Sequence, residues 1–112
     1  MLDTEKVPAT AIAKLNDELR KKIPLPLVYP HQTVMTDEIA ALPEDKIQAV
    51  LLMVREHNDF TESNDPHSER DFGEFEFEGQ KIFWKFDYYN EDMEHFEENG
   101  RRILMVMYAH EY

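Results

Sequence analysis

Histidine and carboxylate side chains cluster in and just after the polar stretch from His57 to Arg70. The candidate ligands are His57, Asp59, Asp65, His67, Glu69 and Asp71. Imidazole and carboxylate groups together suit divalent metal ions, and a loop can wrap around such an ion. A small metal-dependent hydrolase that uses His57, His67 and Asp71 is therefore one candidate function.

The same residues also have a purely structural interpretation, an ordered loop. Asp, Asn, Pro and His are ordinary turn residues, and the helical His-Glu spacing of metalloproteases is absent from the sequence. In this interpretation Asn64 and Asp65 accept hydrogen bonds from backbone N–H groups, and His67 packs or caps. Nucleophilic catalysis has less support, because Ser63 and Ser68 lie in no elbow motif and the chain has no cysteine.

Acidic residues give the chain its other candidate chemistry. The formal net charge is −12, and residues 56–98 hold fifteen acidic side chains against three basic ones. The flanks, 1–55 and 99–112, are close to neutral. A field of this sign favours basic partners and repels phosphate, which argues against direct nucleic-acid binding through this segment.

Glutamates alternate with aromatic residues along one predicted strand, and acidic residues recur in a later connection. Alternate residues on one strand face lie about 6.7 Å apart, roughly two base-pair rises of DNA. Such a set could imitate the field of a duplex and occupy a basic nucleic-acid channel of another protein. The predicted partner-binding residues are Glu74, Glu76, Glu78, Glu91, Asp92, Glu94, Glu97 and Glu98. The competing interpretation is a solvated face that keeps a small protein soluble, with Glu76 paired to Lys81.

Length and composition limit the class of protein. A chain of 112 residues is the size of one domain with a single core, and without cysteine it has no disulfide or cysteine-based zinc site. No apolar run approaches the ~18 residues of a membrane span, and the first residues lack the pattern of a signal peptide. We expect one domain over 1–112, loosely ordered over 1–8, in the cytoplasm, with no cofactor and no membrane contact.

Two helices are predicted from the spacing of apolar residues. Apolar side chains recur at steps of three or four in Ala9–Lys22, and prolines at 24 and 26 end this helix. A second helix has Pro43 at its first position and acidic residues in its first turn. Its core-facing stripe consists of Ile47, Val50, Leu51 and Val54, widened by Leu52 and Met53.

Strand patterns fill most of the remaining chain. Leu27–Thr36 predicts a short or edge strand, and Asp71–Tyr88 a hairpin with Glu78-Gly79 as its turn. This register pairs Glu76 with Lys81, Phe75 with Ile82 and Gly73 with Trp84, which leaves space for the indole. An apolar run over 103–108 adds a third strand. The predicted fold class is α+β, with two helices packed on one face of a small antiparallel sheet that has a C-terminal three-stranded meander.

Four segments carry a resemblance to a known family. They are Asn64–His67, Glu69–Gly73, Ile82–Tyr89 and the pair Glu111-Tyr112. Together they resemble Domain of Unknown Function 3768, a family of small bacterial proteins frequent on plasmids and other mobile elements, over roughly residues 10–112. The resemblance implies no particular activity. It implies that the gene lies among genes that travel between hosts and often encode counter-defence proteins.

Charge and resemblance lead to one expectation about function. We expect a non-enzymatic acidic inhibitor that binds a basic, nucleic-acid-handling host defence enzyme by DNA mimicry, of the anti-CRISPR or anti-restriction kind. Aromatic residues such as Tyr89 or Phe96 would anchor the rim of that interface. The metal-dependent hydrolase and an accessory protein with a merely solubilising acidic surface remain the alternatives.

Overall fold

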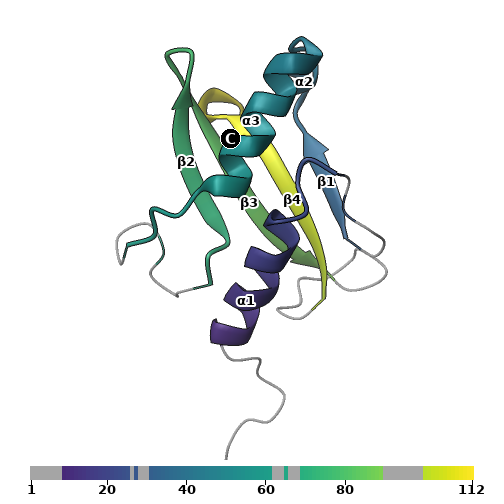
Figure 1. The fold of residues 1–112 in the computed structure, drawn as a ribbon, viewed down its shortest axis with the longest axis vertical. Coiled ribbons are helices and arrows are strands. Elements are labelled where there is room, and N and C mark those ends of the chain that lie inside the picture. Colours follow the sequence, from purple (N-terminus) through teal and green to yellow (C-terminus); the bar gives the residue numbers. More distant parts are fainter. Residues whose placement is uncertain (1–8, 26, 28–30, 62–64, 66–68, 90–99) are drawn as a thin grey trace, which may run out of the picture.

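A four-stranded sheet carries its two longer helices on one face (Figure 1). The computed structural model describes residues 9–25, 27, 31–61, 65, 69–89 and 100–112. The elements in chain order are α1 (Ala9–Arg20), β1 (Gln32–Met35), α2 (Asp37–Ala40), α3 (Glu44–Glu56), β2 (Phe72–Phe77), β3 (Gln80–Tyr89), β4 (Arg101–Tyr108) and the 3₁₀ helix η1 (Ala109–Glu111). The predicted α+β class is confirmed.

The helix α3 follows the predicted apolar stripe. It begins at Glu44, one residue later than predicted, and it buries Val50, Leu51 and Val54. The prediction that Leu52 and Met53 widen the stripe is wrong, because their exposed fractions are 42% and 37%. Successive residues of a helix are rotated by about 100° around its axis. Leu52 and Met53 therefore both point more than roughly 90° away from the middle of the buried stripe.

The other helices differ from the predictions in extent. α1 ends at Arg20 rather than at residue 22, and a turn follows in which the Lys21 N–H donates to the Asp17 carbonyl. The four-residue α2, which buries Ile39, was not predicted, since one turn has too few apolar positions to show a period. No helix in the described part of the chain has the length and apolarity needed to cross a membrane.

The sheet is mixed rather than purely antiparallel. Its strand order is β1-β4-β3-β2, and β2, β3 and β4 form the predicted antiparallel meander. β1 is an edge strand, as predicted, but it pairs with β4 in parallel. The cause is the return of the chain along α3, after which β2 starts in the direction of β1 (Figure 1). Two further reversals give β4 that same direction.

The hairpin has the predicted register and turn. Glu76 pairs with Lys81, Phe75 with Ile82 and Gly73 with Trp84. The turn residues Glu78 and Gly79 have φ angles of 52° and 80°, and positive φ at both positions is the pattern of the tight turns that match strand twist. The local sequence therefore sets this hairpin correctly.

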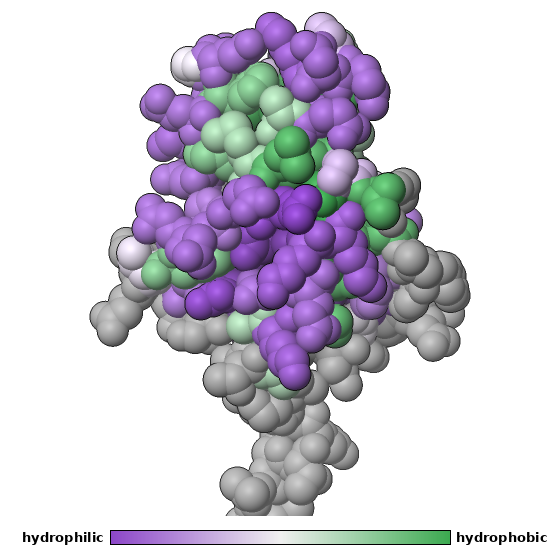
Figure 2. Space-filling model, viewed as in Figure 1, coloured by the Kyte–Doolittle hydropathy of each residue, from purple (hydrophilic) through white to green (hydrophobic). Residues whose placement is uncertain are grey.

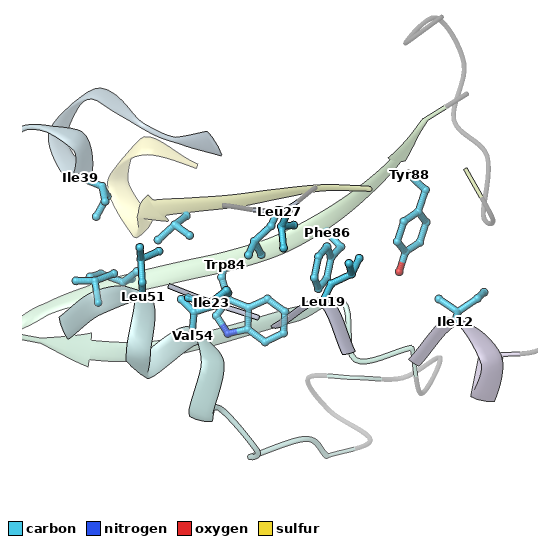
Figure 3. Packing of buried hydrophobic residues seen from close by; sticks show 14 residues of the cluster. Ile12, Leu19, Ile23, Leu27, Ile39, Leu51, Val54, Trp84, Phe86 and Tyr88 are labelled. Carbon is cyan, nitrogen blue, oxygen red and sulfur yellow. The ribbon is translucent and has the colours of Figure 1, made fainter. Parts of the chain in front are cut away.

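The hydrophobic core lies between the sheet and the helices (Figure 3). Residues of β3 alternate across the sheet, and its buried positions, Ile82, Trp84, Phe86 and Tyr88, all belong to the core cluster. Trp84 is fully buried, and a Cβ added at Gly73 would lie 2.4 Å from its Nε1 atom. Gly73 is therefore required by the space that the indole occupies.

Candidate partner-binding surface and neighbouring polar sites

His57, a predicted metal ligand, packs against aromatic rings. Its imidazole lies edge-on to Phe60 and Trp84, with centroid distances of 4.9 and 5.5 Å. Burial and, to a smaller extent, the positive charge of Arg20 hold the pKa of His57 below its ordinary value of 6.5. The imidazole is therefore neutral at pH 7.

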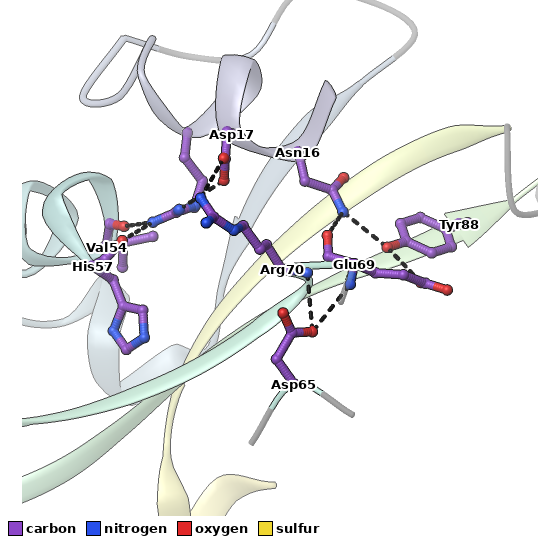
Figure 4. A network of polar contacts seen from close by, with 9 residues as sticks. Asn16, Asp17, Val54, His57, Asp65, Glu69, Arg70 and Tyr88 are labelled. Atoms are coloured by element: carbon purple, nitrogen blue, oxygen red, sulfur yellow. Dashed lines mark hydrogen bonds and ion pairs between the residues drawn. The ribbon is translucent and has the colours of Figure 1, made fainter. Parts of the chain in front are cut away.

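Asp65 closes the loop in the way the structural interpretation predicts (Figure 4). Its Oδ1 atom accepts the backbone N–H groups of Glu69 and Arg70, each at 3.1 Å. The side chain is nearly buried, so these two bonds replace its hydration. Asn64 and His67 lie outside the described residues. For Asp65, the prediction of a backbone-binding turn residue is confirmed.

Asn16 connects α1 to the loop, β3 and β4 through a buried polar network (Figure 4). Its Nδ2 atom donates to the Tyr88 hydroxyl at 2.9 Å and to the Glu69 carbonyl at 3.0 Å. Its Oδ1 atom accepts from Nε of Arg102 at 2.8 Å. Burial raises the pKa of Tyr88 and lowers that of Arg102. Sequence reasoning missed this network, although Asn16 lies four residues after Ile12 on the apolar face of its helix.

Arg20, the last residue of α1, binds the end of α3. Its Nη1 atom donates to the carbonyls of Val54 and His57 at 2.8 Å each, and its Nη2 atom pairs with Asp17 at 3.0 Å. The carbonyls at a helix C-terminus lack intrahelical donors, and cationic side chains can supply them. Arg20 therefore caps one helix from another, a contact that the spacing of residues in its own helix does not show.

We expect stability to fall as the pH falls through about 6.5, the ordinary histidine pKa, because His57 is held neutral in the folded state. The unfolded chain takes up a proton as the pH falls through its higher histidine pKa, and the folded chain does not. Chemical denaturation at a series of pH values measures this slope. His57→Phe keeps a ring against Phe60 and Trp84 and should reduce the slope. An unchanged slope in that variant would contradict the assignment.

Among the described residues, three potential metal ligands converge at a different place from the predicted one. The ligand atoms of Glu38, His110 and Glu111 lie within 4.8 Å of one another. His57 and Asp71 form no such group of three with any other described residue. The Nε2 atom of His110 contacts the Glu38 carboxylate, so these side chains join η1 to α2.

Glu111 is itself held by neutral donors. It accepts the Thr36 hydroxyl at 2.7 Å and the Tyr108 N–H at 3.1 Å. Burial raises the pKa of Glu111, but these hydrogen bonds outweigh it, and the pKa lies below its ordinary value. The carboxylate is therefore charged at neutral pH.

The three described members of the predicted acidic surface lie close to lysines. Glu74 pairs with Lys81 at 3.8 Å, and Lys81 also stands opposite Glu76 in the hairpin. Glu78 pairs with Lys46 of α3 at 2.9 Å. Glu78 lies in the turn, so it does not continue the row formed by Glu74 and Glu76 on the strand. The remaining predicted residues, Glu91, Asp92, Glu94, Glu97 and Glu98, lie outside the described residues.

The excess negative charge of the described residues lies at one end of the molecule, formed by α2, the first turn of α3, the hairpin tip and η1 (Figure 1). Six carboxylates and Lys46 lie in these elements, whereas the other described residues include ten acidic and ten basic side chains. Figure 2 shows hydrophilic residues along the margin of this end. We call these six residues the acidic end: Asp37, Glu38, Glu44, Asp45, Glu78 and Glu111.

The acidic end is not visible in the sequence, because a sum of charge along the chain does not show which elements meet in space. Residues 1–55 are close to neutral, since basic side chains of α1 and the turn after it offset the acids of α2 and α3. In space, α1 lies at the opposite half of the molecule from α2 (Figure 1). A near-neutral sum therefore concealed two regions of opposite sign.

One known protein family matches this chain. Residues 35–111 match the family described as "Protein of unknown function (DUF3768)". The chain belongs to this family. The match begins within β1, so α1 of this DUF3768 member, with Asn16 and Arg20, precedes the matched region. Comparisons with curated proteins and with solved structures give no match.

Proposed function

We propose that this protein is a non-enzymatic inhibitor that binds a basic, nucleic-acid-handling host defence enzyme by DNA mimicry, of the anti-CRISPR or anti-restriction kind. The observation that carries the proposal is the acidic end, which contains six carboxylates and only one lysine among its described residues. Carboxylates fixed on a folded surface can replace backbone phosphates opposite Lys and Arg side chains. Such an inhibitor acts in the cytoplasm, where these enzymes meet DNA.

Helix geometry supports the charge at this end. Asp37 and Glu38 form the first turn of α2, and Glu44 and Asp45 that of α3. All four side chains are exposed. Acidic residues in a first turn are stabilised by the helix dipole, so these charges are compatible with the fold.

An exposed aromatic side chain adjoins the acidic end. Tyr112 follows Glu111 directly, and its exposed fraction is 73%. Its ring rests edge-on against Phe83 at a centroid distance of 5.5 Å. Tyrosine is enriched among residues that dominate binding energy at interfaces, so Tyr112 is the aromatic anchor that we propose.

The acidic connection between β3 and β4 is a second, separable source of charge. β3 has ten residues, so about 33 Å of strand separates the hairpin tip from Tyr89, where the connection begins. The acidic end and residues 91–98 can therefore be tested separately by substitution.

The test is binding to CRISPR and restriction complexes in a pull-down with a salt titration, followed by competition with duplex DNA. Neutralising three exposed members of the acidic end, Asp37→Asn, Glu44→Gln and Asp45→Asn together, should weaken binding by on the order of 100-fold. Affinity of the unmodified protein should fall steeply with salt, and DNA should compete. Tyr112→Ala should also weaken binding.

A matched control variant has the same net charge as the triple variant of the acidic end. The triple variant Glu18→Gln, Glu56→Gln and Asp59→Asn removes three exposed carboxylates elsewhere and should leave binding nearly unchanged. Glu94→Gln, Glu97→Gln and Glu98→Gln together measure the share of the acidic connection. Equal loss in every triple variant would indicate bulk charge alone, and unchanged binding with unchanged salt response would exclude mimicry through these carboxylates.

A further inference from the structure

A pocket with an excess of cationic side chains opens where the ends of α1 and α3 approach the loop before β2. Its volume is about 390 Å³. It is lined by Asp17, Arg20, Lys21, Arg55, Glu56, His57, Asn58 and Arg70. Four of these side chains are cationic and two are acidic, in a chain whose net charge is −12.

The two carboxylates do not neutralise the pocket. Asp17 is shared between Arg20 and Arg70, at 3.0 and 2.9 Å. The contact between Arg55 and Glu56 is long, at 3.5 Å, and both side chains are largely exposed. The lining therefore has a net charge of about +2, because His57 is neutral.

Helix ends would normally oppose an anion at this place, because a C-terminus carries partial negative charge. Here several of these carbonyls already have donors. Arg20 binds the carbonyl of Val54 in the last turn of α3 and that of His57 just after the helix, and backbone N–H groups of residues 21–23 bind carbonyls of α1. The cationic side chains therefore determine the sign of the field in the pocket.

Two nitrogen atoms of the lining residues lack hydrogen-bond partners among the described residues. The Arg20 side chain is only 5% exposed, and its Nε–H has no acceptor. The Nε2 atom of His57 is likewise buried without a partner. Both atoms are covered by neighbouring groups, so they make the inner wall of the pocket polar without facing its open space.

We infer that this pocket binds a small phosphate monoester. A monoester carries close to two negative charges at pH 7, which matches the net charge of the lining. One guanidinium group can bind two phosphate oxygens at once. Arg55 and Arg70 supply two such groups beside the fixed charge of Arg20. The volume lies at the lower end of the roughly 300–1,000 Å³ of small-molecule sites, so a mononucleotide-sized ligand fits. The site is separate from the acidic end and does not depend on the proposed function.

Calorimetric titration of the full chain with AMP, inorganic phosphate and adenosine tests the assignment. AMP should bind at least as tightly as phosphate, and adenosine should not bind. Arg55→Gln and Arg70→Gln should each weaken AMP binding roughly tenfold or more. Arg55→Gln is the variant that keeps the fold safest, because its only described ion pair is the exposed contact with Glu56.

Lys14→Gln is the matched control, because it removes one exposed cation from α1 outside the pocket lining. AMP affinity should be unchanged in this variant. A pocket that takes phosphate but excludes AMP would overturn the monoester assignment. Absence of saturable binding, or equal weakening by Lys14→Gln and Arg55→Gln, would overturn the site.

Discussion

Replacing Gly73 by alanine is expected to lower the free energy of unfolding by about 3 kcal/mol, measured by denaturant titration. An added Cβ would lie 2.4 to 2.8 Å from three atoms of the Trp84 indole, closer than real Cβ atoms approach their neighbours. Trp84 is fully buried within the core cluster, so its ring cannot move aside without disturbing that packing. The added methyl group therefore forces either the strand or the indole out of place.

A second substitution identifies the cause. Trp84→Phe removes the part of the ring that stands over Gly73, together with an Nε1–H that has no hydrogen-bond partner among the described residues. The double variant should be more stable than the sum of the single effects predicts, by at least about 1 kcal/mol. Gly79→Ala is the control, since φ is +80° there and no atom lies within 4 Å, so only a backbone cost of about 1 kcal/mol is expected. Equal costs at Gly73 and Gly79 with no coupling would contradict the close packing.

Replacing Arg20 by leucine is expected to lower the free energy of unfolding by about 3–5 kcal/mol. Leucine keeps apolar volume but removes the donors to the end of α3 and leaves the Asp17 carboxylate with one cation fewer. The guanidinium also lies 4.7 Å from the Trp84 ring centroid and 5.3 Å from that of Phe60, so stacking is lost as well. Thermal and denaturant unfolding both report the change.

The neighbouring lysine separates this role from general loss of positive charge. Lys21→Ala removes an exposed cation one residue later and should change stability by less than about 0.5 kcal/mol. Arg20→Lys keeps the charge but loses the planar fork, so it should retain only part of the stability. If Arg20→Leu behaves like Lys21→Ala, the cap between the two helices contributes nothing.

The hairpin was predictable because its determinants are local. Glu78-Gly79 selects a two-residue turn, and the alternation of Phe75 and Phe77 with glutamates fixes which face is buried. The glycine opposite Trp84 then follows from the register. Each of these statements concerns residues of one hairpin, at most eleven positions apart, where spacing and side-chain size decide the structure.

Features that depend on distant segments were not predictable in the same way. The parallel pairing of β1 with β4 follows from the direction in which α3 returns the chain, which no single segment encodes. Arg20 caps α3 across 34 residues of sequence, and Asn16 reaches Arg102 across 86. For the candidate site, the sequence shows an excess of acidic residues over 56–98, and of the predicted partner-binding residues only Glu78 belongs to the acidic end. The acidic end arises only because α2, α3, the hairpin tip and η1 come together.

The position of β4 in the sheet has a consequence for synthesis. Of the four strands, β4 leaves the ribosome last, yet it lies in the interior of the sheet, between β1 and β3. Until it emerges, β1 has no neighbouring strand and β3 has a free edge on the side where β4 will pair. A nascent chain therefore holds unpaired edges on β1 and β3 while most of its core residues are already made, and the sheet closes in one late step.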